Sequence, residues 1–173
     1  MAKLKDEIQK VQPFAEPEQE AFLNVVRTAD VLSRPFEELS KGTGLSATQY
    51  NVLRILRGAG KDGLPCGQIV ERMITRDPDM TRLLDRLQKR DLIARARDAA
   101  DRRIVRANIT AKGLNLLATL DQPLVEMHRR VLGHMGKRRL AQLIELLEEA
   151  RGGANDRNSL CDGRQMKDSA RRK

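Results

Sequence analysis

The chain has 173 residues, with 33 lysines and arginines against 24 aspartates and glutamates, so its formal net charge is +9 and its pI is near 10.1. This length suits one domain with long helical extensions, and the basic charge favours a polyanionic partner. Neither an apolar run long enough to span a membrane nor an apolar leader is present, so we expect a cytoplasmic protein without a membrane partner. Two cysteines, Cys66 and Cys161, are too few for a disulfide framework.

The amino-terminal part predicts an arm followed by one long helix. Residues 1–17 contain two prolines and few apolar side chains, so we expect an arm that folds only against another surface. Within residues 18–44, Phe22, Val25 and Leu32 belong to an apolar stripe at helical spacing, which the glycines near its end terminate. This stripe predicts a dimerisation helix.

The next segment predicts two helices separated by a glycine-rich break. Ser46 and Gln49 are placed for a capping box, in which each side chain accepts a hydrogen bond from the other residue's backbone N–H. Pro65 is placed to open a short second helix. The candidates for burial in that helix are Ile69, Val70 and Met73.

A third helix is predicted over residues 78–90, after a turn at 74–77. Asp77 is a suitable N-cap, and Pro78 fits the first helical position. The opposite, polar face of this helix is free to contact a partner. Its apolar face consists of Met80, Leu83, Leu84 and Leu87.

After Asp91 the apolar pattern changes to a period of two, which is typical of strands. The two arms of the predicted hairpin are residues 94–97 and 105–109. The six residues 98–103 that follow the first arm are more than a tight turn needs, and they present Arg102 and Arg103 at an exposed tip. Such a guanidinium pair suits phosphate contacts or insertion into a narrow minor groove.

Residues 45–109 therefore predict a winged helix-turn-helix, made of helix, short helix, turn, helix and hairpin. This segment holds 14 lysines and arginines against 8 aspartates and glutamates, which is most of the chain's basic excess. The predicted fold class is mainly α with a small β-hairpin wing, in which long dimerisation helices flank the winged unit. Double-stranded DNA is the expected partner.

Beyond the hairpin, residues 110–151 predict two further dimerisation helices. Thr110 can cap the first of them, and the second is expected to run from Lys137 to about Arg151, where Gly152 and Gly153 stop it. Residues 152–173 are expected to form a flexible basic tail. The apolar seam of these helices includes Leu117, Leu124, Leu143 and Leu147.

The flanking helices predict a homodimer, because a small winged unit cannot cover three extra amphipathic helices of its own chain. Two-fold symmetry would place two recognition helices about one duplex turn apart. The expected target is an inverted repeat with half-site centres roughly 10 base pairs apart.

At this point the chain resembles the MarR-type winged helix-turn-helix regulators over roughly residues 20–150. The best segments are LSATQYNVLRIL at 45–56, MTRLLDRLQKRDLIAR at 80–95, DAADRR at 98–103 and ITAKG at 109–113. The resemblance implies a homodimeric transcription factor, usually a repressor, that acts on double-stranded DNA. It also implies that a small aromatic compound, or oxidation of a cysteine, releases the DNA in many members.

The resemblance also assigns residues to the interface. Thr81, Arg82 and Arg86 fall on the DNA-facing side of the recognition helix, and Asp101 falls where an acidic residue steadies the wing tip. The chain departs from the family at Asp91, where a glycine is usual, and across residues 75–79. The full set of expected DNA contacts is Arg76, Asp79, Thr81, Arg82, Arg86, Arg102 and Arg103, with Asp98 and Asp101 bracing the wing.

Other functional classes find less support in the sequence. No phosphate-cradling glycine motif, nucleophile elbow or paired acid and base is visible, so we expect neither an enzyme nor a cofactor. His128 and His134 are six residues apart and do not share a helix face, which argues against a metal site. Cys66 beside Pro65 could serve as a redox switch or as a small, partly buried residue. The alternative function is an architectural or protein-binding dimer that does not select a DNA sequence.

Overall fold

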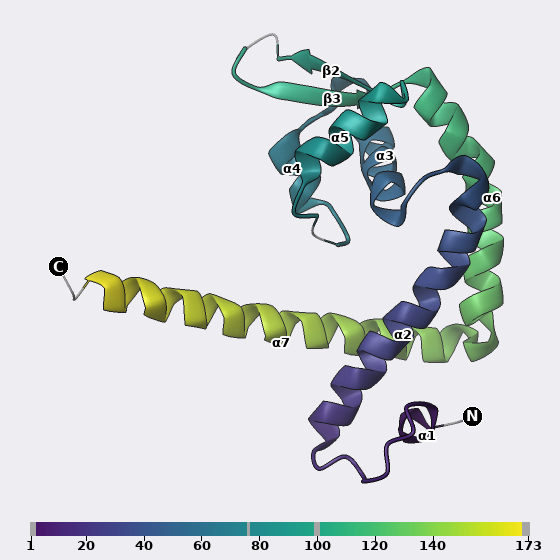
Figure 1. Ribbon diagram of the computed structural model, residues 1–173, viewed down its shortest axis with the longest axis vertical. Helices are drawn as coiled ribbons and strands as arrows, with labels where there is room; N and C mark the ends of the chain where they lie inside the picture. The colour runs from purple at the N-terminus through teal and green to yellow at the C-terminus, as the bar shows by residue number, and fades with distance from the viewer. Residues whose placement is uncertain (1–2, 76, 99–100, 171–173) are drawn as a thin grey trace. The chain divides into compact units, whose positions relative to one another are not determined.

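The computed structural model describes residues 3–75, 77–98 and 101–170, with side chains described up to Ala154 (Figure 1). Its contacts divide the chain into two compact units, Met1–Met127 and His128–Lys173. The first unit contains the predicted winged helix-turn-helix. Each unit is described by itself below.

The first unit is mainly helical, with one small antiparallel sheet, as the sequence predicts. Its elements in chain order are α1 (Leu4–Glu7), α2 (Pro17–Ser40), the 3-10 turn η1 (Lys41–Thr43), α3 (Ala47–Ala59), the 3-10 turn η2 (Gly60–Asp62), β1 (Leu64–Pro65), α4 (Cys66–Glu71), α5 (Met80–Lys89), β2 (Ile93–Arg97), β3 (Val105–Ile109) and α6 (Ala111–Leu132), whose last turn belongs to the second unit.

The sheet has the strand order β1-β3-β2, and both pairings are antiparallel. The hairpin places Ile93 opposite Ile109 and Arg97 opposite Val105, which confirms the two predicted arms. Strand β1 was not predicted, and it places Leu64 opposite Ala107 at the outer edge of β3. The hairpin therefore starts from a three-stranded base, and its far end extends past the helices (Figure 1).

The core of this unit is formed by α3, α4, α5, the base of the hairpin and α6. All four predicted apolar residues of α5 are buried. In α4, Ile69 is fully buried and Val70 is 40% exposed, and Met73, which follows the helix, is half-buried, so the prediction for Val70 and Met73 was wrong. A helix of six residues has fewer than two turns, and only one position faces the core. The largest fully buried side chains are Val52, Leu53, Leu56, Ile69, Leu87, Leu92, Ile93 and Leu117.

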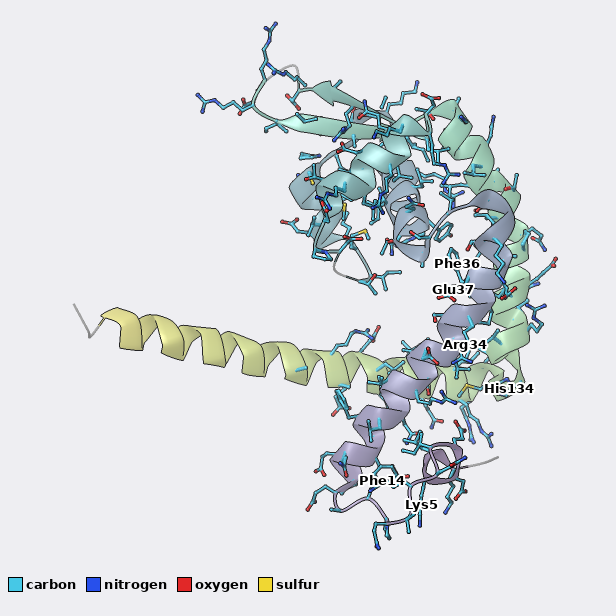
Figure 2. All side chains as sticks on the ribbon, in the orientation of Figure 1. Lys5, Phe14, Arg34, Phe36, Glu37 and His134 are labelled. Atoms are coloured by element: carbon cyan, nitrogen blue, oxygen red, sulfur yellow. The ribbon has the colours of Figure 1, made fainter. Side chains whose placement is uncertain are left out.

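Two side-chain contacts, one aromatic and one ionic, tie the long helices to the winged part. Phe36 of α2, which Figure 2 labels, packs on Tyr50 of α3 with ring centroids 5.1 Å apart. The Arg57 Nη1 atom on α3 lies 2.9 and 2.8 Å from the two carboxylate oxygens of Asp121 on α6. These contacts join helices that are distant in sequence.

Two predicted helix starts are confirmed and one was wrong. Ser46 and Gln49 form the capping box of α3, and the Thr110 hydroxyl accepts a hydrogen bond from the Gly113 N–H at 3.1 Å. The N-cap of α5 is Asp79 and not Asp77, and Pro78 precedes the helix. Asp77 instead accepts a hydrogen bond from the Asp79 N–H at 2.8 Å, which orders the turn before the helix.

The amino-terminal arm is not independent of its own chain. Its short helix α1 buries Leu4, and the Glu7 carboxylate lies 3.4 Å from the Arg27 Nε atom on α2. The arm therefore contacts α2 of its own chain, where the sequence predicted an arm that folds only against another surface.

The second unit contains the last turn of α6, the 3-10 turn η3 (Gly133–Met135) and α7 (Gly136–Ala170). Helix α7 passes through Gly152 and Gly153, so the predicted stop at this pair was wrong. Glycine costs only about 1 kcal/mol per helical position relative to alanine, which weakens a helix without forbidding it. Among the described residues, no helix combines the length and the apolar character needed to cross a membrane.

Candidate nucleic-acid interface

The outer face of α5 has the shape and charge of a recognition helix. Its inner face is buried against the core, so Thr81, Arg82 and Arg86 stay exposed on the outside. The Arg82 side chain is 77% exposed, so its guanidinium is accessible to a partner. Arg76, which the sequence also assigned to this interface, lies outside the described residues.

Asp79 holds the start of this face in place. Its Oδ1 atom accepts a hydrogen bond from the Arg82 backbone N–H at 3.2 Å, and its Oδ2 atom lies 3.1 Å from the Arg82 Nε atom. One carboxylate therefore satisfies an unpaired helix donor and orients the guanidinium one turn later. The structure gives Asp79 these two contacts, although the sequence had assigned it to DNA directly.

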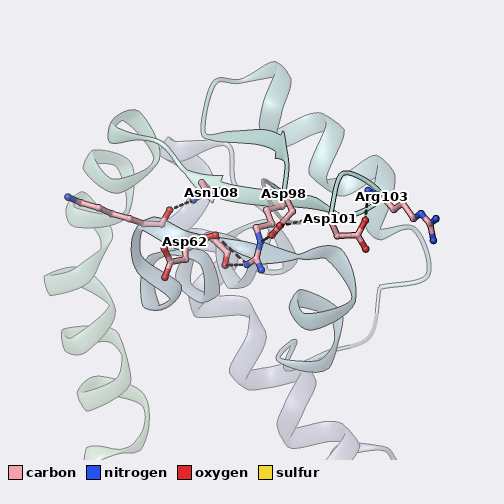
Figure 3. A network of polar contacts seen from close by, with 8 residues as sticks. Asp62, Asp98, Asp101, Arg103 and Asn108 are labelled. Carbon is pink, nitrogen blue, oxygen red and sulfur yellow. Dashed lines mark hydrogen bonds and ion pairs between the residues drawn. The ribbon is translucent and has the colours of Figure 1, made fainter.

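The tip of the hairpin exposes Arg102 and Arg103. Their backbone is ordered by Asp101, whose carboxylate accepts a hydrogen bond from the Arg103 N–H at 2.9 Å (Figure 3). The Asp101 carbonyl oxygen accepts a second bond from the Ile104 N–H at 3.0 Å. Asp101 thus contacts the backbone of the tip, and the two guanidinium groups remain accessible to solvent.

Asp98 links this tip to the body of the hairpin. One of its carboxylate oxygens pairs with the Arg106 Nε atom, and the other accepts a hydrogen bond from the Asp101 N–H at 3.1 Å (Figure 3). The Asp98 side chain is only 14% exposed, so these contacts are screened less than surface pairs are. The geometry agrees with a bracing role at this position.

The base of the hairpin is fixed by two residues that the sequence analysis did not select. Asn108 Nδ2 donates to the Lys61 carbonyl oxygen at 2.6 Å. Arg106 Nη1 lies 3.5 and 3.4 Å from the carbonyl oxygens of Asp62 and Gly63 (Figure 3). The sequence shows that Arg106 and Asn108 alternate with the apolar residues of β3. Their acceptors at residues 61–63 are more than 40 residues away in sequence, so these contacts could not be inferred from it.

Two further arginines, also missed, connect α5 to its surroundings. Arg95 on β2 pairs with Asp85 and donates to Gln88, both of which are on α5. Arg90, directly after α5, donates to the carbonyl oxygens of Thr43 and Gly44 at 2.7 Å each. Helix α5 is therefore attached to the hairpin on one side and to the turn that follows α2 on the other.

The residues expected at the dimer interface fall into three groups by exposure. Phe22 and Val25 on α2 are 68% and 49% exposed, whereas Leu117 and Leu124 on α6 are buried within the chain itself. A side chain that is fully buried in its own chain offers no surface to a second copy, so for Leu117 and Leu124 the structure supports a core role. The remaining three, Leu32, Leu143 and Leu147, are half-buried.

The chain is similar to known proteins both in sequence and in structure. The profile of the MarR family matches residues 45–105. The crystal structure of a MarR transcription factor from Planctomyces limnophilus is 41% identical, with a TM-score of 0.61, and the alignment covers 79% of this chain and 98% of that one.

Two other proteins are similar at a lower sequence identity. The HTH-type transcriptional regulator MhqR of Bacillus subtilis is 34% identical over 74 residues, which are 43% of this chain and 50% of that protein. The S. aureus MepR–DNA complex is 20% identical with a TM-score of 0.68, covering 77% of this chain and 96% of that one. At that identity the likeness supports the fold alone.

Proposed function

Because the chain belongs to the MarR family of transcription factors, we propose that it acts as a homodimeric repressor that binds an inverted-repeat operator. Regulation of transcription through DNA binding is the activity of its family, whose members are not enzymes. The observation that carries the more specific proposal is the exposed arginine face of α5 beside a hairpin whose tip is braced by Asp98 and Asp101.

In the proposed complex, the outer face of α5 lies in the major groove. Arg82 is the first candidate for a bidentate contact to guanine, because Asp79 orients its guanidinium while leaving it exposed. Thr81 and Arg86, and Arg76 before the helix, would contact neighbouring bases or phosphates. A bidentate pair discriminates against the wrong base by about 1 to 3 kcal/mol.

The hairpin would contact the adjacent minor groove. Arg102 and Arg103 are exposed at its tip, and a narrow minor groove attracts arginine through its enhanced negative potential. Asp98 and Asp101 would limit the conformations of this tip before binding. The hairpin tip would then lose less conformational entropy when the complex forms.

The homodimer is proposed from apolar side chains that a single copy leaves exposed. On α2 these include Phe22, Val25 and Val26, and on α7, described by itself, they include Ile144 and Leu146. Contiguous exposed apolar surface marks an interaction site in a folded protein. In this proposal residues 18–44 and 110–151 form the dimer around two copies of the winged unit, residues 45–109, and half-sites lie about 10 base pairs apart.

The test is selection of binding sites from random duplex DNA, followed by competition of the selected site against random duplex. We expect a two-fold symmetric site, and we expect Arg82→Ala to lower the preference for that site by about 1 to 3 kcal/mol. Arg54→Ala on α3 is the matched control, since it removes an exposed arginine outside α5, the hairpin tip and the proposed dimer helices. A selected-to-random affinity ratio near one in the wild-type protein would favour the architectural alternative.

Repression and ligand control are tested separately. Transcription in vitro from a template carrying the selected site should decrease when the protein is added.

A groove of about 440 Å³ lies beside the end of α5, and its lining includes Leu92, Leu116, Arg90 and Lys112. This groove supports binding of a small aromatic compound that releases the DNA. Titration of aromatic acids against the operator complex should lower its affinity, and an unchanged affinity for the whole series would contradict this part.

A further inference from the structure

The position of Arg95 follows from the alternation of β2. Ile93 lies on the face of the strand that is buried, being only 2% exposed. Side chains two residues apart on a strand share a face, so Arg95 lies on the same face as Ile93, one step farther along the hairpin. A charged side chain thus occupies an inward-facing position at the edge of the core, next to α5.

The contacts of Arg95 are with two residues on one side of α5. Its Nη2 atom pairs with the Asp85 carboxylate, and its Nε atom donates to the Gln88 side-chain oxygen. Asp85 and Gln88 are three residues apart, so they lie on adjacent turns and offer acceptors to one planar guanidinium. The Arg95 side chain is 28% exposed and that of Asp85 is 43% exposed, so the pair is open to solvent.

Asp85 is the reason why this pairing matters for DNA. It lies in the middle of α5, directly before Arg86 and three residues after Arg82. A carboxylate at this position without a cation would repel the phosphates that the neighbouring arginines attract. Asp79, the N-cap of α5, is already paired with Arg82.

We propose that Arg95 is a positioning residue for DNA binding, which neutralises Asp85 and fixes β2 against the recognition helix without itself contacting DNA. This inference rests on the proposed function. It predicts that loss of Arg95 harms binding chiefly because Asp85 is left unpaired. If Arg95 instead contacted a phosphate, its loss would harm binding whether or not Asp85 carried a charge.

The test is a double-mutant cycle with Arg95→Met and Asp85→Asn, measured as affinity for the selected site. Methionine keeps an apolar stem of similar length, and asparagine keeps the shape of aspartate, so both changes leave packing nearly intact. We expect Arg95→Met to weaken binding about five- to tenfold, Asp85→Asn to change it by less than about twofold, and the double variant to recover to within about twofold of wild type.

Arg97→Met is the matched control, because Arg97 is an exposed arginine two residues farther on the same strand face. Asp85→Asn should not rescue any loss that Arg97→Met causes. Thermal unfolding of each variant separates weaker binding from a smaller folded fraction. A double variant as weak as Arg95→Met, with all variants folded, would overturn the inference, and so would equal rescue of Arg97→Met.

The same titrations distinguish the two possible failures. If the wild-type protein binds the selected site no better than random duplex, the proposed function fails, whatever the variants do. If the wild-type protein discriminates and Arg82→Ala loses discrimination while the cycle is additive, only the role of Arg95 is wrong.

Discussion

Gly63 links the base of the hairpin to η2, and its replacement by alanine tests how the wing is held. The residue has φ 59° and ψ −168°, a backbone conformation that is almost restricted to glycine. A Cβ atom built there would lie 2.3 Å from the Asn108 side chain and 2.4 Å from the Ala107 carbonyl oxygen. Gly63→Ala therefore meets both backbone strain and a steric clash.

The two costs can be estimated separately. The unusual backbone conformation costs about 1 to 3 kcal/mol for a residue with a side chain. The clash adds roughly 1 to 3 kcal/mol, since one of the two contacted groups is main chain of β3 and cannot rotate away. We therefore expect Gly63→Ala to lower the free energy of unfolding by about 2 to 6 kcal/mol, a large part of a typical domain's stability of about 5 to 15 kcal/mol.

Gly60→Ala is the matched control. Gly60 has a similar backbone conformation, φ 69° and ψ −148°, but a Cβ atom there would meet nothing within 4 Å. Urea unfolding at one protein concentration should show a loss of about 1 to 3 kcal/mol for Gly60→Ala and a clearly larger loss for Gly63→Ala. Equal losses for the two variants would refute the contact between Gly63 and β3.

Three further predictions concern other contacts of the first unit. Asp79→Ala removes the N-cap of α5, so urea unfolding should show a loss of about 1 kcal/mol, and the preference for the selected DNA site should decrease as well. Phe22→Asp places a charge on the exposed apolar surface of α2, so sedimentation should show dissociation into single chains; an intact dimer would exclude Phe22 from the interface. Arg90→Met removes two hydrogen bonds to main-chain oxygens, so amide hydrogen exchange around Gly44 should become faster, whereas unchanged protection would show that the contact does not order this turn.

Local patterns predicted the parts of the fold that depend on local burial. The apolar residues of α5 and the alternation of the hairpin arms correspond to the observed elements because each reports directly which face is covered. Strand β1 was not predictable, since its two residues are too few to show a period. Asp77 and Asp79 offer the same capping chemistry to the same helix, and only the three-dimensional turn decides between them.

The connections around the candidate site were less accessible to sequence reasoning. Arg106 and Asn108 bind main-chain oxygens near residues 61–63, and no residue pattern in those loops indicates an acceptor. Arg95 did carry a signal, because it shares a strand face with the apolar Ile93. Asp91 adopts φ 58° at the end of α5, so an aspartate takes the left-handed conformation for which the family commonly uses glycine.

Arg90 donates two hydrogen bonds to the main chain, and this pattern affects how mutations in the region are tolerated. Its acceptors are carbonyl oxygens, which every amino acid supplies, so a change of side chain at Thr43 leaves the acceptor in place. A change at Arg90 removes the only donor of the two bonds at once. A deep mutational scan should therefore show an asymmetric profile, with Arg90 intolerant of neutral side chains and its acceptor partner much more permissive.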